Sequence, residues 1–300
     1  MQNHSIDTRR ASIIAVPVAA LSAAGCGKEN SSSSTTTSPS TTTAPVTSTT
    51  TSLSATTPTP TSTPSDRTSV TVYLISGEAL GAAGRSGVAA TPARSAMEEL
   101  VKGPSESDIS AGLSTAIPTG TRLLGIDIAS GIATVDLSNE FGSGGGSLSM
   151  QERVAQVVFT LTQFPTVQKV PFRIDGSPAT ALGGEGVMVD TPQARADWES
   201  MTPAILLESP LPGAQLTSSF QITGTSNTFE ATYQVDLVDS AGAKLYRGFG
   251  TATSGTGTRG TFKQTITFTG AARGTATLRV FERSAEDGSK INVVSIPVTI

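Results

Sequence analysis

The stretch LGIDIASGIATVDL, residues 124–137, decides the fold class of the central part of this chain. Apolar side chains alternate with polar or small ones on both sides of Ser130-Gly131, a dipeptide that favours a tight turn. A period of two places the apolar side chains on one face of a strand and the others on the opposite face. The stretch therefore predicts a β-hairpin with one apolar face.

One helix is predicted on each side of this hairpin. Thr91 followed by Pro92 is typical of a helix start, and apolar residues then recur at helical spacing up to a Gly-Pro pair. Ser149 and Glu152 have the spacing of a capping box, and the apolar stripe that follows them ends at Pro165. Both stripes predict core packing and not a ligand site.

Strands complete this region. Residues 69–75 and 170–174 alternate and are rich in β-branched or aromatic side chains, so each predicts a strand. Between the first strand and the first helix we expect a Gly/Ala-rich loop. Its glycines are Gly77, Gly81, Gly84 and Gly87. The resulting order β-α-β-β-α-β predicts a small mixed sheet with both helices on one face, over residues 68–200.

Residues 201–300 predict an all-β domain. Short alternating runs are separated by Gly, Asp and Asn, as in a sandwich of the immunoglobulin type. In the run 229–237 we expect Phe229, Ala231, Tyr233, Val235 and Leu237 to share the core face. The other runs cover 205–207, 220–222, 245–249, 262–268, 276–281 and 291–300. The predicted fold class is therefore α+β, a small mixed-sheet domain followed by an all-β immunoglobulin-like sandwich.

Residues 1–25 predict an export signal. Arg9 and Arg10 precede an uncharged apolar stretch that is too short to span a bilayer, and small residues then lead to Cys26. This ending resembles the lipobox of bacterial lipoproteins. The resemblance implies thioether acylation of Cys26, with palmitate among the acyl chains, cleavage before it, and anchoring on the extracytoplasmic face of the bacterial cell membrane. General secretion and twin-arginine export both stay open.

Residues 26–67 predict a disordered linker. From Ser31 to Ser65 the sequence is almost entirely Ser, Thr and Pro, which is too polar to bury a core. Such a segment spans roughly 35 Å as a flexible coil, enough to hold a domain clear of a membrane. The same composition is also typical of O-glycosylated stalks, and the two interpretations carry equal weight.

Composition excludes several classes of chemistry. The chain has one Cys and one His, and the histidine, His4, lies in the predicted signal. Intrachain disulfides, cysteine metal clusters and a Ser-His-Asp triad are therefore excluded for the mature chain. A formal net charge of -4 argues against nucleic acid as a partner. We expect no enzymatic activity, no cofactor and no metal.

Acidic residues allow two further interpretations. Asp127 and Asp136 lie on the predicted hairpin, where a carboxylate pair would suit acid-base work, although solvated strand aspartates are the favoured interpretation. Glu282, Glu286 and Asp287 offer oxygen ligands for calcium, but Arg283 interrupts them and no EF-hand pattern is present. A polar hairpin tip is the better prediction.

A glycine-rich stretch and a tryptophan complete the candidates. Residues 142–146 read GSGGG, but no phosphate-binding lysine follows, so a flexible loop is predicted. Trp198, the single Trp, is expected to pack at the domain junction, with an exposed aromatic contact as the alternative.

Several motifs resemble the GerMN domain of bacterial sporulation and germination proteins. The resemblance implies an extracytoplasmic domain similar to ring-building motifs, with a role in envelope complexes and no established enzymatic chemistry. The motifs are those of residues 94–104, 112–118, 131–138 and 157–162. In the C-terminal region the motifs at 209–213, 228–231, 260–262 and 282–288 resemble the Gmad-type immunoglobulin-like domain that accompanies GerMN domains.

Two functions from different classes follow as expectations. The first is a non-catalytic, lipid-anchored surface lipoprotein whose domains recognise other envelope proteins. The alternative is binding or weak hydrolysis of a cell-wall glycan, peptidoglycan, for which a carboxylate pair is the minimum equipment. The partner's identity, the oligomeric state and whether the host sporulates are not determined by the sequence.

Overall fold

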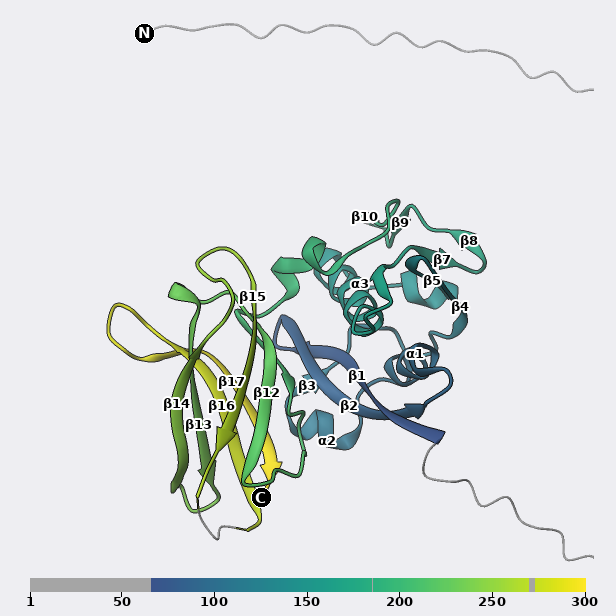
Figure 1. Ribbon diagram of the computed structural model, residues 1–300. Coiled ribbons are helices and arrows are strands. Elements are labelled where there is room, and N and C mark those ends of the chain that lie inside the picture. The colour runs from purple at the N-terminus through teal and green to yellow at the C-terminus, as the bar shows by residue number, and fades with distance from the viewer. Residues whose placement is uncertain (1–65, 185, 270–272) are drawn as a thin grey trace, which may run out of the picture. The chain divides into compact units, whose positions relative to one another are not determined.

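The computed structural model describes residues 66–184, 186–269 and 273–300 (Figure 1). The predicted signal, with Arg9, Arg10 and Cys26, and the predicted linker up to residue 65 lie outside the described residues. The described residues all belong to one compact unit of the chain.

The first domain opens with an antiparallel hairpin. β1 (Arg67–Ser76) pairs along its whole length with β2 (Ala79–Val88), and β3 (Leu113–Ser114) pairs with the end of β1, so the sheet order is β2-β1-β3. The loop predicted for the Gly/Ala-rich segment is therefore wrong, since all of it beyond the tight turn at Gly77 is strand.

Close packing accounts for the small side chains of this strand. A Cβ atom at Gly87 would lie 2.8 Å from the Cβ of Ser95 on the first helix, and one at Gly81 would lie 2.7 Å from Leu113 Cδ2. Ser95 Oγ also accepts a hydrogen bond from the Val88 amide. These glycines lie where neighbouring elements approach the β2 backbone closely, which is a common reason for glycine within a strand.

This packing predicts a cost for a single methyl group. Gly87→Ala should lower the free energy of unfolding by about 1–3 kcal/mol, because the first helix must shift to relieve the overlap with Ser95. Gly184→Ala is the matched control, since a Cβ there meets nothing within 4 Å. Denaturant unfolding measures both, and equal stabilities for the two variants would show that β2 tolerates a side chain at position 87.

The α-helices of the described residues differ in the residue that caps their N-terminus. α1 (Pro92–Lys102) begins as predicted, with Thr91 as N-cap. α2 (Glu106–Ser110) is a short, unpredicted helix that Ser105 and Asp108 close with a reciprocal capping box. α3 (Ser147–Leu161) has Gly146 as N-cap, so the predicted capping box at Ser149 is wrong.

α3 is the centre of the first domain. It is buried on every side from Arg153 to Leu161, as expected of a helix that packs against several neighbours. It contacts α1 and β1, and one hydrophobic core joins its side chains to those of β1 and β5 (Gly131–Leu137). The single mixed sheet that we predicted is therefore wrong. Strands of separate sheets surround α3, because a helix with no exposed face needs neighbours on every side.

The second sheet of this domain contains the predicted hairpin. β4 (Leu123–Ala129) pairs with β5, and β5 runs parallel to β6 (Val167–Lys169) and β7 (Phe172–Ile174). β8 (Ser177–Pro178) pairs with β7, and β9 (Ala181–Leu182) pairs with β10 (Val187–Met188). Within the described residues this domain also contains the 3-10 helices η2 (Asn139–Gly142) and η3 (Arg195–Met201).

The hairpin has its predicted apolar face only on one strand. Ala133, Val135 and Leu137 of β5 are fully buried, whereas Leu124 and Ile128 of β4 are 45% and 39% exposed. β4 lies at the edge of its sheet, so fewer neighbours cover its side chains.

The second domain is the predicted β-sandwich. One sheet has the order β11-β12-β15, formed by β11 (Ile205–Ser209), β12 (Ser219–Ser226) and β15 (Gly260–Thr267). The other has the order β14-β13-β16-β17, formed by β14 (Lys244–Thr251), β13 (Thr232–Asp239), β16 (Thr275–Arg283) and β17 (Lys290–Thr299). The fold class predicted from the sequence, α+β followed by an immunoglobulin-like sandwich, is confirmed.

One predicted core position of the sandwich is wrong. Tyr233, Val235 and Leu237 share the core face, but Phe229 is 54% exposed. Phe229 and Ala231 belong to the 3-10 turn η4 (Phe229–Ala231), where a period of two does not apply.

Candidate functional site

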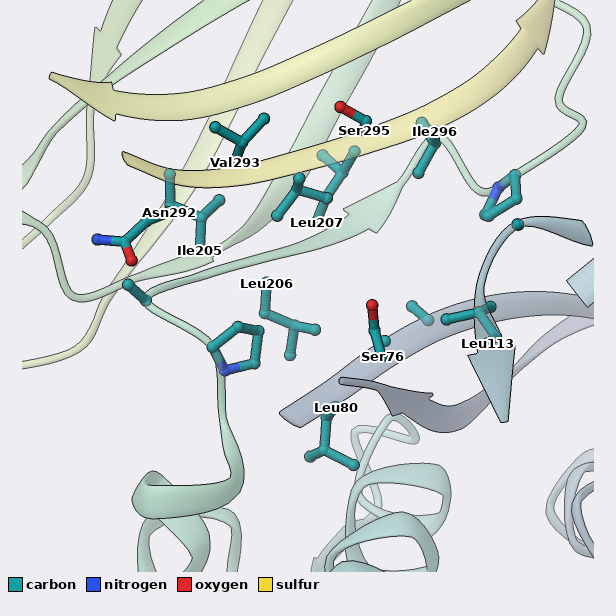
Figure 2. A pocket seen from close by; sticks show the side chains of 17 residues that line it. Ser76, Leu80, Leu113, Ile205, Leu206, Leu207, Asn292, Val293, Ser295 and Ile296 are labelled. Carbon is teal, nitrogen blue, oxygen red and sulfur yellow. The ribbon is translucent and has the colours of Figure 1, made fainter. Parts of the chain in front are cut away.

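β11 belongs to two hydrophobic cores at once. Ile205 and Leu207 pack in the core of the sandwich, while Leu206 between them packs in the core of the first domain. Figure 2 shows the side chain of Leu206 directed away from those of Ile205 and Leu207. Because successive side chains of a strand point to opposite faces, one short strand connects both domains.

Glu208 continues the Leu206 side of β11 into a polar cluster. Its carboxylate accepts hydrogen bonds from the Tyr73 hydroxyl and from Arg195 Nη1, the latter at 2.8 Å. Arg195 Nη2 also donates to Tyr73 Oη at 3.1 Å, and its guanidinium lies 4.6 Å from the ring centre of Phe159. Residues from β1, α3, η3 and β11 therefore meet at one point.

Burial and neighbouring charges shift the pKa values of Tyr73 and Arg195 in this cluster. Burial raises the pKa of the Tyr73 hydroxyl, and the negative charge of Glu208 raises it further, against the opposing effect of Arg195. Burial lowers the pKa of Arg195, but Tyr73 and Glu208 outweigh that effect and raise it. Tyr73 therefore stays a neutral donor and Arg195 stays a cation, so the cluster serves as a connection between domains and not as an acid-base pair.

A double-mutant cycle tests this connection. Tyr73→Phe and Glu208→Gln should each lower the free energy of unfolding, with a coupling energy of about 1–3 kcal/mol, because the two side chains share a charge-assisted hydrogen bond. Denaturant unfolding of the two single variants and the double variant gives the coupling. Strictly additive effects would show that the hydrogen bond contributes nothing.

A cavity of about 440 Å³ lies beside β11. Its wall from the first domain includes Ser76, Leu80 and Leu113, and its wall from the sandwich includes Val293 and Ile296 (Figure 2). No lining residue is charged, and the cavity presents neutral polar groups, including the side chains of Ser76, Asn292 and Ser295, together with apolar surface. We call it the interdomain cavity. Its chemistry suits binding and provides no group for acid-base catalysis.

An open strand edge borders the interdomain cavity. β17 is the last strand of its sheet. Near its end the outer edge is occupied, because the Gly213 amide donates to the Pro297 carbonyl and the Leu216 amide to that of Thr299. Earlier along β17, residues 292–296 line the cavity. Of these, residues 294–296 pair with β16, and within the described part of the chain no other strand pairs with them. Such an edge can accept an added extended segment.

The predicted aspartate pair lies elsewhere. Asp127 is opposite Thr134 and Asp136 is opposite Gly125, so the two carboxylates share the outer face of the hairpin in offset register. Asp136 Oδ1 accepts a hydrogen bond from the Gly176 amide, and neither aspartate lines the interdomain cavity. This arrangement supports the solvated interpretation and gives no support to glycan hydrolysis.

Arg153 organises the glycine-rich stretch, and sequence reasoning missed it. Its side chain is 3% exposed, and it donates to the carbonyls of Phe141, Ser143 and Gly144 at 2.8 Å each. It also donates to the carbonyl of Ala116 and to Ser149 Oγ. An arginine inside an otherwise apolar helical stripe was the available signal, because such a charge requires acceptors.

The predicted acidic cluster is divided by the fold. Glu282 is 7% exposed on β16, where it accepts hydrogen bonds from the Phe229 amide and from Asn292 Nδ2, each at 2.7 Å. Glu286 and Asp287 are exposed in the following turn, as a polar hairpin tip predicts. Within the described residues, no group of three or more His, Cys, Asp or Glu side chains is arranged to hold a metal ion.

Trp198 packs in the core of the first domain. It is 7% exposed and lies in the same cluster as Met201 and Leu206, so the packing interpretation is confirmed. Its Nε1 has no hydrogen-bond partner among the described residues.

Length and apolar character together decide whether a helix can cross a bilayer. In residues 66–184, 186–269 and 273–300, no helix has both properties to the extent that a membrane span needs.

These features define a two-domain protein in which an α+β domain and an immunoglobulin-like sandwich share one strand beside an uncharged cavity. The model of the Germane family, described as sporulation and spore germination, matches residues 35–180. The model of the Gmad2 family, an immunoglobulin-like domain of bacterial spore germination, matches residues 204–289. The chain is therefore a protein with a GerMN domain followed by a Gmad-type domain.

Several solved structures are similar to part of this chain, with low TM-scores. The tandem GerMN domains of the sporulation protein GerM from Bacillus subtilis are 22% identical, with a TM-score of 0.40, over 67% of this chain and 61% of that one. The first GerMN domain of GerM alone is 28% identical, with a TM-score of 0.38, over 43% and 99%. A Clostridium perfringens protein described as a candidate lipoprotein is 20% identical, with a TM-score of 0.34, over 45% and 93%. No curated protein matches the chain.

Proposed function

We propose that this chain is a non-catalytic, lipid-anchored surface protein that binds another envelope protein through the interdomain cavity. The observation that carries the proposal is the open edge of β17 at residues 294–296 beside an uncharged wall that presents both polar and apolar surface. An extended protein segment would add its backbone to the edge and place apolar side chains against Leu80, Leu113 and Leu206.

The anchor is the second part of the proposal. Cys26 follows small residues at the end of the predicted signal, and the Ser/Thr/Pro-rich stretch separates it from the first domain. Two domains of germination-associated families fit a role in envelope assembly. Mass analysis of the mature N-terminal peptide tests the anchor: we expect the chain to begin at an acylated Cys26. A mature chain that retains Met1 would refute this part.

Site-specific crosslinking tests the cavity. A photoreactive residue in place of Val293, which lines the cavity and is 47% exposed, should capture one defined protein in intact envelopes. The same residue in place of Ile109, which is 61% exposed and does not line the cavity, should capture none.

A blocking variant makes the test specific. Ser76→Trp fills the cavity from an exposed position at the end of β1, so it should abolish the adduct. Ser177→Trp, exposed on β8, is the matched control and should leave the adduct unchanged. An adduct that persists in Ser76→Trp, or that forms equally from position 109, would refute binding through the cavity.

A further inference from the structure

The outer face of the four-stranded sheet carries a row of charges that the proposed function does not use. In the strand register, Asp236 on β13 lies directly opposite Arg247 on β14 and Arg279 on β16. Cross-strand partners share a face of the sheet, and the neighbouring Val235 and Val280 lie in the sandwich core. Asp236, Arg247 and Arg279 therefore lie on the opposite, outer face.

Basic side chains dominate this outer face. Among the paired residues of the four strands, five basic side chains lie on it against the single acidic side chain of Asp236, although the whole chain has a net charge of -4. They are Lys244, Arg247, Arg279, Arg283 and Lys290. We call these five residues together with Phe249 the basic face.

The internal ion pairs of the basic face leave two arginines unpaired. Asp236 is 1% exposed, and its carboxylate accepts from Lys290 Nζ at 2.6 Å and from Arg247 Nε at 3.3 Å. Arg283 donates to the Gly288 carbonyl. Within the described residues, no carboxylate forms an ion pair with Arg279 or Arg283. Their charges are available to an external anion.

An exposed aromatic ring accompanies these charges. Phe249 and Phe281 both pair with Gln234, so the two rings lie in one row on the outer face. Phe281 is buried beneath Lys290 Nζ, which lies 4.0 Å from the ring centre, whereas Phe249 is 66% exposed. A surface that combines unpaired cations with an exposed aromatic side chain suits the boundary of an anionic bilayer, where headgroups bind the cations and the ring leaves water.

We propose that the basic face binds an anionic phospholipid surface, with Arg279 and Arg283 contacting headgroup phosphates and Phe249 entering the interfacial layer. Charge complementarity selects an anionic partner. The exposed Phe249 selects a lipid surface over a dissolved polyanion, because only the bilayer removes the ring from water. This contact is distinct from the anchor at Cys26 and from the interdomain cavity.

Vesicle sedimentation tests the proposal on the full chain carrying Cys26→Ser, so that no acyl group contributes. The protein should bind vesicles of phosphatidylcholine with about one third phosphatidylglycerol, and binding should weaken as salt rises. It should not bind pure phosphatidylcholine. Arg279→Gln with Arg283→Gln should weaken binding about 30-fold, since each basic residue near an anionic surface contributes about fivefold.

Two controls distinguish lipid binding at the basic face from a general effect of charge and from binding of a dissolved polyanion. Arg94→Gln with Lys102→Gln removes two exposed charges of α1 and should leave vesicle binding unchanged. Phe249→Ser should weaken binding to vesicles but not to soluble polyphosphate. The proposal is overturned by equal binding to neutral vesicles, by full binding of the double arginine variant, or by a Phe249→Ser variant that binds vesicles as the parent does.

Discussion

We expect the Leu206→Ala variant to lose about 2–5 kcal/mol of the free energy of unfolding, the range for removing a buried leucine side chain. Leu206 is 2% exposed and is the β11 residue that packs in the core of the first domain. It also lines the interdomain cavity, so truncation would enlarge an existing hollow. Denaturant unfolding of the full chain measures the loss.

Two controls make this result specific to the shared strand. Leu124→Ala removes an equal side chain that is 45% exposed on β4, and it should change stability by less than about 0.5 kcal/mol. Leu207→Ala removes a neighbour that packs in the sandwich core, so it should destabilise the sandwich directly. If Leu206→Ala behaved like Leu124→Ala, β11 would not connect the two cores.

Arg153→Met should be the second severe substitution, with a loss of about 3–5 kcal/mol. Methionine fills much of the same space, but it donates no hydrogen bond. The carbonyls of Ala116, Phe141, Ser143 and Gly144 would all lose their donor. Those of Ser143 and Gly144 belong to exposed residues and can bind water, which is why the loss stays below the sum of four buried hydrogen bonds.

The expected phenotype is local as well as global. Without Arg153 the stretch 142–146 should become accessible to proteases, because the guanidinium holds the Ser143 and Gly144 carbonyls against α3. Arg153→Lys should recover only part of the stability, since one ammonium group cannot reproduce five directed donors. Arg173→Met, an exposed substitution on β7, should be neutral. Parent-like protease resistance in Arg153→Met would contradict this role.

Alternation and turn residues predicted most of the fold. The strand runs of the sandwich, the hairpin around Ser130-Gly131 and the start of α1 at Thr91 were all readable, because each depends on neighbours close in sequence. Strand β2 could not be predicted from the sequence. Ser95 and Leu113, which come from other parts of the chain, leave no room for a side chain at Gly87 and Gly81, and a segment rich in glycine is typical of a loop.

The sequence by itself determined the fold class, the order of the two domains and the absence of histidine chemistry beyond the predicted signal, because these depend on composition and short-range periodicity. Only the tertiary structure decided that Leu206 and Glu208 serve the first domain while Ile205 and Leu207 serve the second. It also decided that Arg153 holds a loop and that five basic residues from three strands share one face. These arrangements depend on strand pairing and packing between residues far apart in the chain. The periodicity of a sequence carries no information about such contacts.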